Sequence, residues 1–147
     1  MTDTPNKLEL RRAAACFSDP VRREEYFDLY APHVVLHRSP PLPPGLEAVK
    51  QFYRAYWAAF PDIRLSLGSM AEENDLLGCE FVVEGTHRGT FLGVPATNRV
   101  MRAAGVTLLR FESGRCVERW SQTDLLGILT QLGAAVRPPG DPPGAPA

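Results

Sequence analysis

The side chain best suited to chemistry in this sequence is that of Asp124, because of the segments on either side of it. Residues 116–123 alternate with the period of two that a strand requires, and the apolar residues of 125–132 recur at helical spacing. An aspartate at such a junction accepts hydrogen bonds from the first amides of the helix, or it serves as a general base at the end of an apolar pocket. The local sequence leaves both roles open.

The alternation along 116–123 also predicts which side chains accompany Asp124. Trp120 and Gln122 share its strand face, so we expect them to contact any ligand that Asp124 reaches. We expect the other walls of this pocket to come from a helix over 46–60 and a strand over 76–87. An aspartate enclosed in this way loses solvation of its charged form and becomes a stronger base.

His37, His87 and Arg110 are the other candidates for catalysis. His37 ends a short strand, and His87 follows Gly85, whose position inside a strand predicts a bulge that re-aims its neighbours. For each histidine the alternative is a structural role, held by hydrogen bonds. Arg110 lies on a mainly apolar strand face, where an arginine must pair with an acid or hold an anionic group of a ligand.

The helix expected over 46–60 supplies aromatic side chains to the interior. They recur at helical spacing, which predicts either core packing or the wall of a ligand pocket. The candidates for ligand contact on this helix are Tyr53, Tyr56, Trp57 and Phe60.

Neither a metal nor a cofactor is expected. The three histidines are not at metal-ligand spacing, and the sequence has no nucleophile elbow, phosphate-binding glycine loop or dinucleotide fingerprint. Cys16, Cys79 and Cys116 are far apart and odd in number, so we expect reduced residues of the core.

Length and charge restrict the class of protein. A chain of 147 residues suits one domain with a real hydrophobic core. Its 16 basic and 17 acidic side chains give a formal net charge of -1, which excludes a broad electrostatic surface for nucleic acid or an anionic membrane. No apolar run is long enough to span a bilayer and the first residues lack a signal-peptide pattern, so we expect a soluble cytoplasmic protein.

The order of the predicted elements indicates an α+β fold. Helices are expected over 8–17, 19–30 and 46–60, and strands over 34–37, 63–67, 76–88, 100–111 and 116–123. Because helices precede a run of antiparallel strands, we expect a bent antiparallel sheet that wraps the aromatic helix. Residues 1–136 form this single domain, and the proline- and glycine-rich residues 137–147 are expected to be a disordered tail.

Four segments carry a family resemblance when they are taken together. They are Phe60-Pro61-Asp62, Gly85 to Pro95, Arg110 to Arg115, and Glu118 through Asp124 to Gly133. In order and spacing, over roughly residues 8–133, they resemble the SnoaL-like polyketide cyclase family, within the nuclear transport factor 2-like superfamily. The resemblance implies a curved antiparallel sheet that forms a cone around the N-terminal helices, as in ketosteroid isomerase.

The resemblance also implies a reaction. In characterised cyclases of this family, an acid at the position of Asp124 removes a proton from carbon next to a carbonyl, and an intramolecular aldol closes the ring without metal or cofactor. It therefore implies a small apolar or aromatic polycarbonyl ligand, with Asp124 as general base. The family's second polar residue is often a histidine on the neighbouring strand. This chain has Arg110 in that region, and His37, His87 and Gln122 are the substitutes.

Other functions of the same fold stay open, because one fold carries many activities. A hydrolase or hydroxylase would use Asp124 in water or oxygen chemistry, and an isomerase would use it to move a proton. A non-catalytic module would use the pocket only to bind a small molecule. An Asp124 bonded only to amides of its own helix would favour the module, whereas enclosure with Trp120 and Gln122 would favour an enzyme.

The strands carry apolar residues at both parities, which predicts that both faces of the sheet are covered. Val106 and Leu108 oppose Leu109 and Phe111, whereas a sheet open to water on one face alternates more cleanly. A copy of the same sheet is the economical cover, and the related cyclases and isomerases associate through this face. We therefore expect a homo-oligomer, most simply a twofold dimer.

Overall fold

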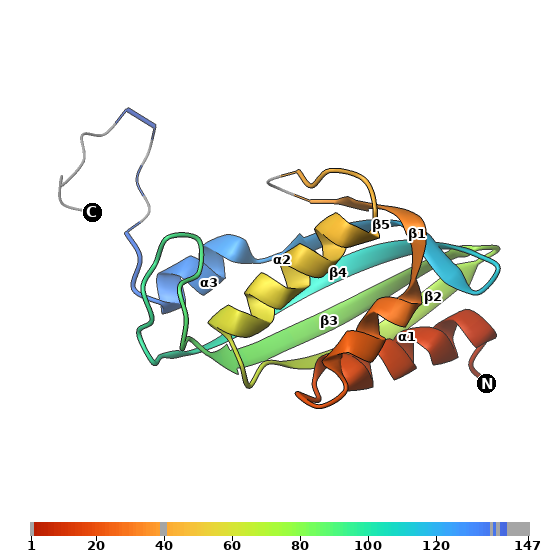
Figure 1. The fold of residues 1–147 in the computed structure, drawn as a ribbon, viewed down its shortest axis with the longest axis horizontal. Helices are drawn as coiled ribbons and strands as arrows, with labels where there is room; N and C mark the ends of the chain where they lie inside the picture. Colours follow the sequence, from red (N-terminus) through yellow and green to blue (C-terminus); the bar gives the residue numbers. More distant parts are fainter. Residues whose placement is uncertain (1, 39–40, 136, 138, 141–147) are drawn as a thin grey trace.

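The computed structural model describes residues 2–38, 41–135, 137 and 139–140, which form a curved sheet flanked by helices (Figure 1). This is the α+β class expected from the sequence. The elements are α1 (Pro5–Phe17), the 3₁₀ helix η1 (Arg23–Leu29), β1 (Tyr30–His37), α2 (Leu46–Ala59), β2 (Arg64–Glu73), β3 (Leu76–Thr86), β4 (Val100–Glu112), β5 (Arg115–Thr123) and α3 (Leu125–Gln131). The tail expected over 137–147 lies outside the described residues, except for 137 and 139–140.

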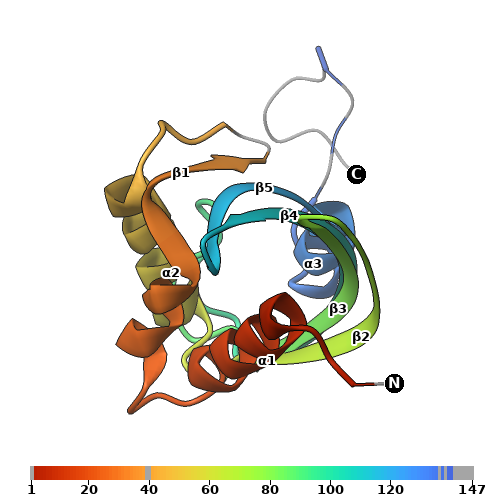
Figure 2. The same ribbon diagram turned by 90° about the vertical axis from the view of Figure 1, so that its right-hand side faces the viewer.

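The strands form one sheet in the order β1-β5-β4-β3-β2. Strands β2 to β5 are successive antiparallel neighbours, which confirms the expected meander. β1 joins the edge parallel to β5, with Leu36 opposite Arg119 and His37 opposite Trp120. Figure 2 shows that the sheet curls and that α1 and α2 close the open side of the curve.

The sequence signals at α1 and α2 explain how these helices sit against the sheet. The Thr4 side chain caps α1 by accepting a hydrogen bond from the amide of Lys7 at 3.2 Å. α2 places Val49, Tyr53 and Trp57 on one buried stripe, because residues four apart share a helix face. No helix among the described residues is both long and apolar enough to cross a membrane.

The second helix begins later and is tighter than the sequence predicts. The Asp19 carboxylate accepts a hydrogen bond from the amide of Val21 in a turn, and η1 starts only at Arg23. Val21, which lies inside the span predicted as this helix, is 92% exposed. Pro32, shortly after the predicted end of this helix, lies inside β1, where it is tolerated because β1 is an edge strand.

The prediction of a bulge at Gly85 is wrong, because the β3–β4 ladder runs through this position without a shift of register. Gly85 instead permits close packing under the sheet. A Cβ atom there would lie 3.2 Å from the Cβ of Phe60 and from the Cα of Ile63. The glycine therefore brings the strand close to the end of α2 and leaves the strand direction unchanged.

A bulge at Val117 in β5 decides which side chains of that strand face inward. Cys116 and Glu118 pair with consecutive residues of β4, which leaves Val117 as an extra residue. Cys116 is buried, and beyond the bulge the buried position is Arg119 rather than Trp120. Because the side-chain period of a strand is two, one extra residue exchanges its faces.

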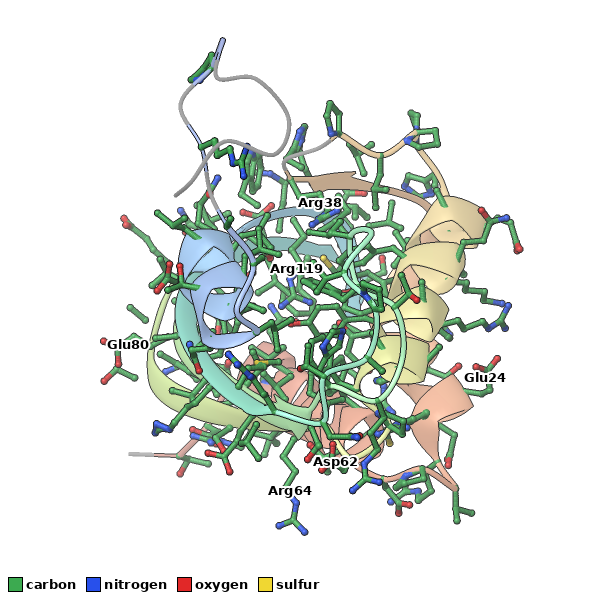
Figure 3. All side chains as sticks on the ribbon, turned by 90° about the vertical axis from the view of Figure 1, so that its left-hand side faces the viewer. Glu24, Arg38, Asp62, Arg64, Glu80 and Arg119 are labelled. Carbon is green, nitrogen blue, oxygen red and sulfur yellow. The ribbon has the colours of Figure 1, made fainter. Side chains whose placement is uncertain are left out.

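The curve of the sheet encloses two arginines. Figure 3 shows Arg38 and Arg119 inside the curve, whereas Glu24, Arg64 and Glu80 lie on the outside of the molecule. Around these arginines the interior is filled mainly by aromatic rings from α1, η1 and α2. The inner side of the curve therefore holds a buried arginine, Arg119, and a half-buried one, Arg38, whereas the outer surface is of mixed charge.

The three cysteines have the state expected from the sequence. Cys16, Cys79 and Cys116 are free and buried. Burial raises the pKa of the Cys116 thiol to about 11, so the thiol is protonated at neutral pH. These residues act as small core side chains.

Candidate active site

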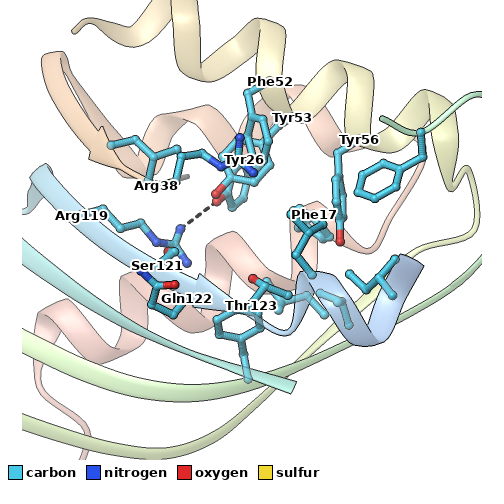
Figure 4. Close-up of a pocket in the computed structure, with 17 residues that line it drawn as sticks. Phe17, Tyr26, Arg38, Phe52, Tyr53, Tyr56, Arg119, Ser121, Gln122 and Thr123 are labelled. Carbon is cyan, nitrogen blue, oxygen red and sulfur yellow. Dashed lines mark hydrogen bonds between the residues drawn. The ribbon is translucent and has the colours of Figure 1, made fainter. Parts of the chain in front are cut away.

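A central cavity of about 330 Å³ lies between the inner face of the sheet and α2 (Figure 4). Both α2 and β3 contribute to its wall, as expected for the pocket. Its lining residues are Phe17, Tyr26, Leu36, Arg38, Phe52, Tyr53, Tyr56, Leu65, Phe81, Val83, Phe91, Arg119, Ser121, Gln122, Thr123, Leu125 and Ile128.

Arg119 brings a positive charge into the central cavity. The residue is 5% exposed, and its guanidinium donates hydrogen bonds to three hydroxyl oxygens. Nε donates to Thr107 at 2.8 Å, while Nη1 donates to Tyr26 at 2.9 Å and to Tyr30 at 2.7 Å. Nη2 has no hydrogen-bond partner among the described residues. It is also not one of the described side-chain nitrogens that are inaccessible to solvent and without a partner. It is therefore free to meet a ligand.

The acceptors around Arg119 are neutral. The phenol oxygens of Tyr26 and Tyr30 lie 2.6 Å apart, and burial raises the pKa of both phenols well above its ordinary value. The Tyr30 hydroxyl donates in turn to that of Tyr53 at 3.4 Å. Because arginine stays protonated in proteins, this arginine–tyrosine cluster keeps its positive charge, and no acidic residue is among the described lining residues.

Such a cluster is built to stabilise negative charge on an oxygen. Removing a guanidinium from water without a counterion is unfavourable by several kcal/mol, even after relaxation of the protein. An oxygen that becomes anionic in the cavity would offset this cost, and hydrogen-bond donors fixed in advance need no reorganisation to hold it. The cavity can therefore bind an anion or favour a reaction that forms one.

Asp124 does not have the inward orientation that the sequence predicts. Its exposed carboxylate accepts a hydrogen bond from the amide of Gly127 at 2.9 Å and caps α3. Thr123 and Leu125 on either side line the central cavity, whereas Asp124 borders a groove on the outer face of the sheet. The parity change at Val117 is the physical reason, because it turns the residues with odd numbers inward.

Trp120, His37 and Arg110 meet on the outer face. The rings of His37 and Trp120 are stacked, with centroids 5.1 Å apart, and Nε2 of His37 lies 2.7 Å from a carboxylate oxygen of Glu118. Arg110 lies 3.4 Å from Asp75 and 3.8 Å from Glu118. Arg110 thus pairs with acids, which is one of the two roles that its strand face allows.

His87 is fully buried and does not line the central cavity. Its Nδ1 accepts a hydrogen bond from the amide of Thr97 at 3.2 Å, so in the neutral ring the proton is on Nε2, which has no partner among the described residues. The ring lies 5.5 Å from that of Phe60. No group of three histidine, cysteine or acidic side chains suited to a metal occurs here or elsewhere in the described chain.

The residues expected to contact a ligand are divided between the cavity and other places. Tyr53, Tyr56 and Gln122 line the cavity. Trp57 and Phe60 are buried in the core and do not line it, and Trp120 lies on the outer face, so none of these three is among the residues that line this cavity. α2 therefore presents only part of its aromatic stripe to the cavity.

Arg119 and Arg38 are candidates that reasoning from the sequence missed. Alternation from Cys116 assigned Arg119 to the outer face, together with every other odd-numbered residue of that strand. Val117 is an ordinary strand residue, so no residue type marks the bulge that reverses this assignment. Arg38 follows the last residue of β1 and enters a proline-rich segment, which gave no sign of an inward side chain.

Comparison with known families gives the lineage of this fold. The model of the SnoaL-like polyketide cyclase family matches residues 8–132. The chain belongs to the SnoaL-like polyketide cyclase family. No curated protein matches this sequence significantly.

Solved structures with the same SnoaL-like fold include three bacterial proteins. IdmH, a proposed polyketide cyclase from Streptomyces antibioticus, is 27% identical with a TM-score of 0.74, covering 88% of this chain and 99% of its own. AclR, a proposed hydroxylase from Streptomyces galilaeus, is 24% identical with a TM-score of 0.77, covering 87% and 95%. A proposed polyketide cyclase from Acidithiobacillus ferrooxidans is 25% identical with a TM-score of 0.77, covering 92% and 100%. The SnoaL-like fold is thus shared by proteins to which different reactions are attributed.

Proposed function

We propose that this SnoaL-like protein binds a polyketide-like polycarbonyl compound in the central cavity and promotes its intramolecular aldol closure. The observation that supports this most directly is the buried charge of Arg119, which is held only by hydroxyl groups among the described residues and has Nη2 free for a ligand. Aromatic wall residues bind the apolar body of the ligand, and the guanidinium binds its reacting oxygen.

The proposed step moves one proton and forms one carbon–carbon bond. The carbon next to a carbonyl loses a proton to a base, for which we propose the Asp124 carboxylate or a water molecule, and the resulting enolate oxygen is stabilised by Arg119. The enolate carbon then attacks a second carbonyl carbon of the same molecule. The electron pair of that carbonyl moves to its oxygen, and the alkoxide takes up a proton from the protonated base. Atoms and charges balance without an oxidant or a cofactor.

We assign the main catalytic effect to Arg119, because the described lining residues include no carboxylate and no imidazole. Asp124 remains a proposed general base, and this role requires its carboxylate to leave the Gly127 amide and turn inward. Asp124→Asn separates the two assignments, since asparagine keeps the helix cap but accepts no proton at neutral pH. Unchanged turnover in Asp124→Asn would mean that Asp124 is not the base and that Arg119 supplies the main effect. Lost turnover in a variant that still folds would assign the role of base to Asp124.

Benzoylacetone, an aromatic β-diketone whose enolate absorbs at longer wavelength than its neutral forms, tests the role of Arg119. In the wild-type protein we expect the apparent pKa of the bound probe to fall by about one to two pH units, because the buried cation favours the enolate. In Arg119→Met we expect no such fall. Arg110→Met, on the outer face, is the matched control and should behave as the wild type. A fall of equal size in Arg119→Met would refute the assignment.

Mass spectrometry of a linear aromatic poly-β-ketone incubated with the protein distinguishes the possible reactions. Aldol closure leaves the mass unchanged, or lower by one water when dehydration follows. Hydroxylation adds one oxygen atom, and hydrolysis adds the elements of water. An added oxygen would favour the hydroxylase alternative over the cyclase.

The second candidate function is non-catalytic binding of the same class of ligand. It is favoured by Asp124, whose carboxylate bonds to an amide of its own helix, and by the lack of a base among the described lining residues. In that case the enolate of benzoylacetone is still stabilised, but linear poly-β-ketones are bound and recovered without change.

We also propose a homodimer formed through the outer face of the sheet. Val106 and Leu108 are 57% and 37% exposed there, beside two shallow apolar grooves. Sedimentation at micromolar concentration should give about twice the 16.2 kDa of the chain. Val106→Lys should shift the protein to a monomer, and a strictly monomeric wild-type protein would contradict the proposal.

A further inference from the structure

We propose that the ligand of the central cavity carries a free carboxylate, and that Arg38 binds it. The inference rests on the proposed function, in which Arg119 holds the reacting carbonyl oxygen. It concerns a second position in the same cavity and narrows the substrate class to polycarbonyl acids, as opposed to neutral esters.

Arg38 is a charged residue of the cavity wall that has no acid beside it in the described chain. It is half-buried, and its guanidinium carbon lies 4.0 Å from the centre of the Phe52 ring. No hydrogen bond or ion pair joins it to another described residue, and the surrounding apolar groups lower its pKa from the ordinary value without removing its charge. A guanidinium lying over an aromatic ring keeps its N–H edges free for a planar anion.

The strand register sets the spacing of the two arginines along the backbone. Leu36 of β1 lies opposite Arg119 of β5, and the two strands are parallel. Arg38 follows Leu36 by two residues, so it faces the same side about 7 Å farther along the strand direction. Figure 4 shows both side chains on the β1–β5 side of the cavity. Two positive charges therefore face one apolar space.

Two cations in one cavity fit a ligand that carries two negatively charged oxygen groups. No acidic residue is among the described lining residues, so neither cation has a counterion in the cavity wall. The enolate oxygen compensates Arg119. Arg38 is more exposed and lies away from the hydroxyls of the arginine–tyrosine cluster. Since the oxygen that becomes negative during the reaction is assigned to Arg119, the group at Arg38 is one that already carries its charge before the reaction. A carboxylate matches the planar fork of arginine, whereas an ester offers no charge.

Benzoylacetone with a para carboxylate, together with the methyl ester of that compound, tests the inference. Calorimetry should show that the wild-type protein binds the acid about tenfold more tightly than the ester, or better, since a charge-assisted hydrogen bond is gained. Arg38→Gln should remove this preference and keep the affinity for the ester. The preference should also decrease as salt is added, because the Arg38 site is partly exposed.

Two control variants make each failure identifiable. Arg102→Gln, on the outer face, should leave both affinities unchanged, and circular dichroism should show the same fold for every variant. Equal affinities for acid and ester in the wild type, or a preference that survives in Arg38→Gln, would overturn the carboxylate inference alone. Unchanged binding of both probes in Arg119→Met would overturn the proposed function instead.

Discussion

The two faces of the curved sheet treat arginine in opposite ways. On the outer face, Arg110 has acidic neighbours at 3.4 and 3.8 Å, and Arg102 lies 3.7 Å from Glu84. On the inner face, Arg119 is buried and bonds only to neutral hydroxyls among the described residues. The outer charges are compensated within the chain, and the inner charge is left for something else to compensate.

This difference teaches where to look for function in a small domain. Exposed ion pairs contribute little to stability, so the outer arginines fit the surface without special cost. A buried charge without a counterion lowers stability, and a fold retains it where binding or catalysis uses it. We therefore propose that the inner face is the functional face.

Alkaline pH should act most strongly on the inner face. The folded-state pKa values of Tyr26 and Tyr30 are raised, so the stability linked to these phenols is present below their unfolded pKa of about 10 and is lost as the pH rises beyond it. Together they should contribute about 3 kcal/mol per pH unit to the fall in the free energy of unfolding above about pH 10, and the raised pKa values of Tyr56 and Cys116 add to the measured slope. Urea denaturation across this range measures the slope, and Tyr26→Phe should reduce it by about 1.4 kcal/mol per pH unit. A slope that Tyr26→Phe leaves intact would contradict this account.

Arg119→Met should stabilise the ligand-free protein by about 1–2 kcal/mol at neutral pH. Methionine fills much of the same volume without a charge, and Tyr26 and Tyr30 keep their mutual hydrogen bond. Chemical denaturation gives the change in the free energy of unfolding. A large loss of stability would mean that the guanidinium serves mainly to hold the fold together.

Thr107→Asp would give the inner arginine the kind of partner that the outer ones have. Oγ1 of Thr107 already lies 2.8 Å from Nε of Arg119, so an aspartate there would compensate the charge. We expect affinity for the benzoylacetone enolate to fall about tenfold, because the ligand then competes with an internal anion. Thr107→Asn, which is similar in size and neutral, is the control and should bind the probe more tightly than Thr107→Asp does.

Arg110→Met should change the free energy of unfolding by less than about 0.5 kcal/mol. Its two acidic neighbours are themselves partly exposed, so water solvates them after the arginine is gone. The small effect should disappear in molar salt, which screens exposed pairs. Denaturation at low and high salt measures both values, and a change above 2 kcal/mol would remove the contrast between the faces.

The sequence predicts the scaffold well because its signals are local. The helical spacing of Val49, Tyr53 and Trp57 and the turn signals between strands require only neighbouring residues to be read. The antiparallel meander follows from those turns. Tyr53 and Tyr56 reach the cavity as expected, since α2 fixes their direction.

The candidate site was harder to predict because it depends on one extra residue. The alternation that starts at Cys116 is right up to Val117 and wrong beyond it, so Trp120 and Arg119 exchange places. The parallel pairing of β1 with β5 brings Arg38 to the same side of the cavity as Arg119. A pairing between the first and last strands cannot be derived from local sequence patterns. Asp124 follows the same error, because its inward direction was deduced from the parity of Trp120.

The bulge at Val117 also bears on how such proteins diverge. A substitution changes one side chain of the cavity. Deletion of a single residue at this position would move every later side chain of β5 to the opposite face of the sheet. The arginine would then emerge at the surface and the tryptophan would enter the interior. Within one lineage, a change of chain length by one residue can thus exchange a buried arginine for a buried tryptophan without any substitution.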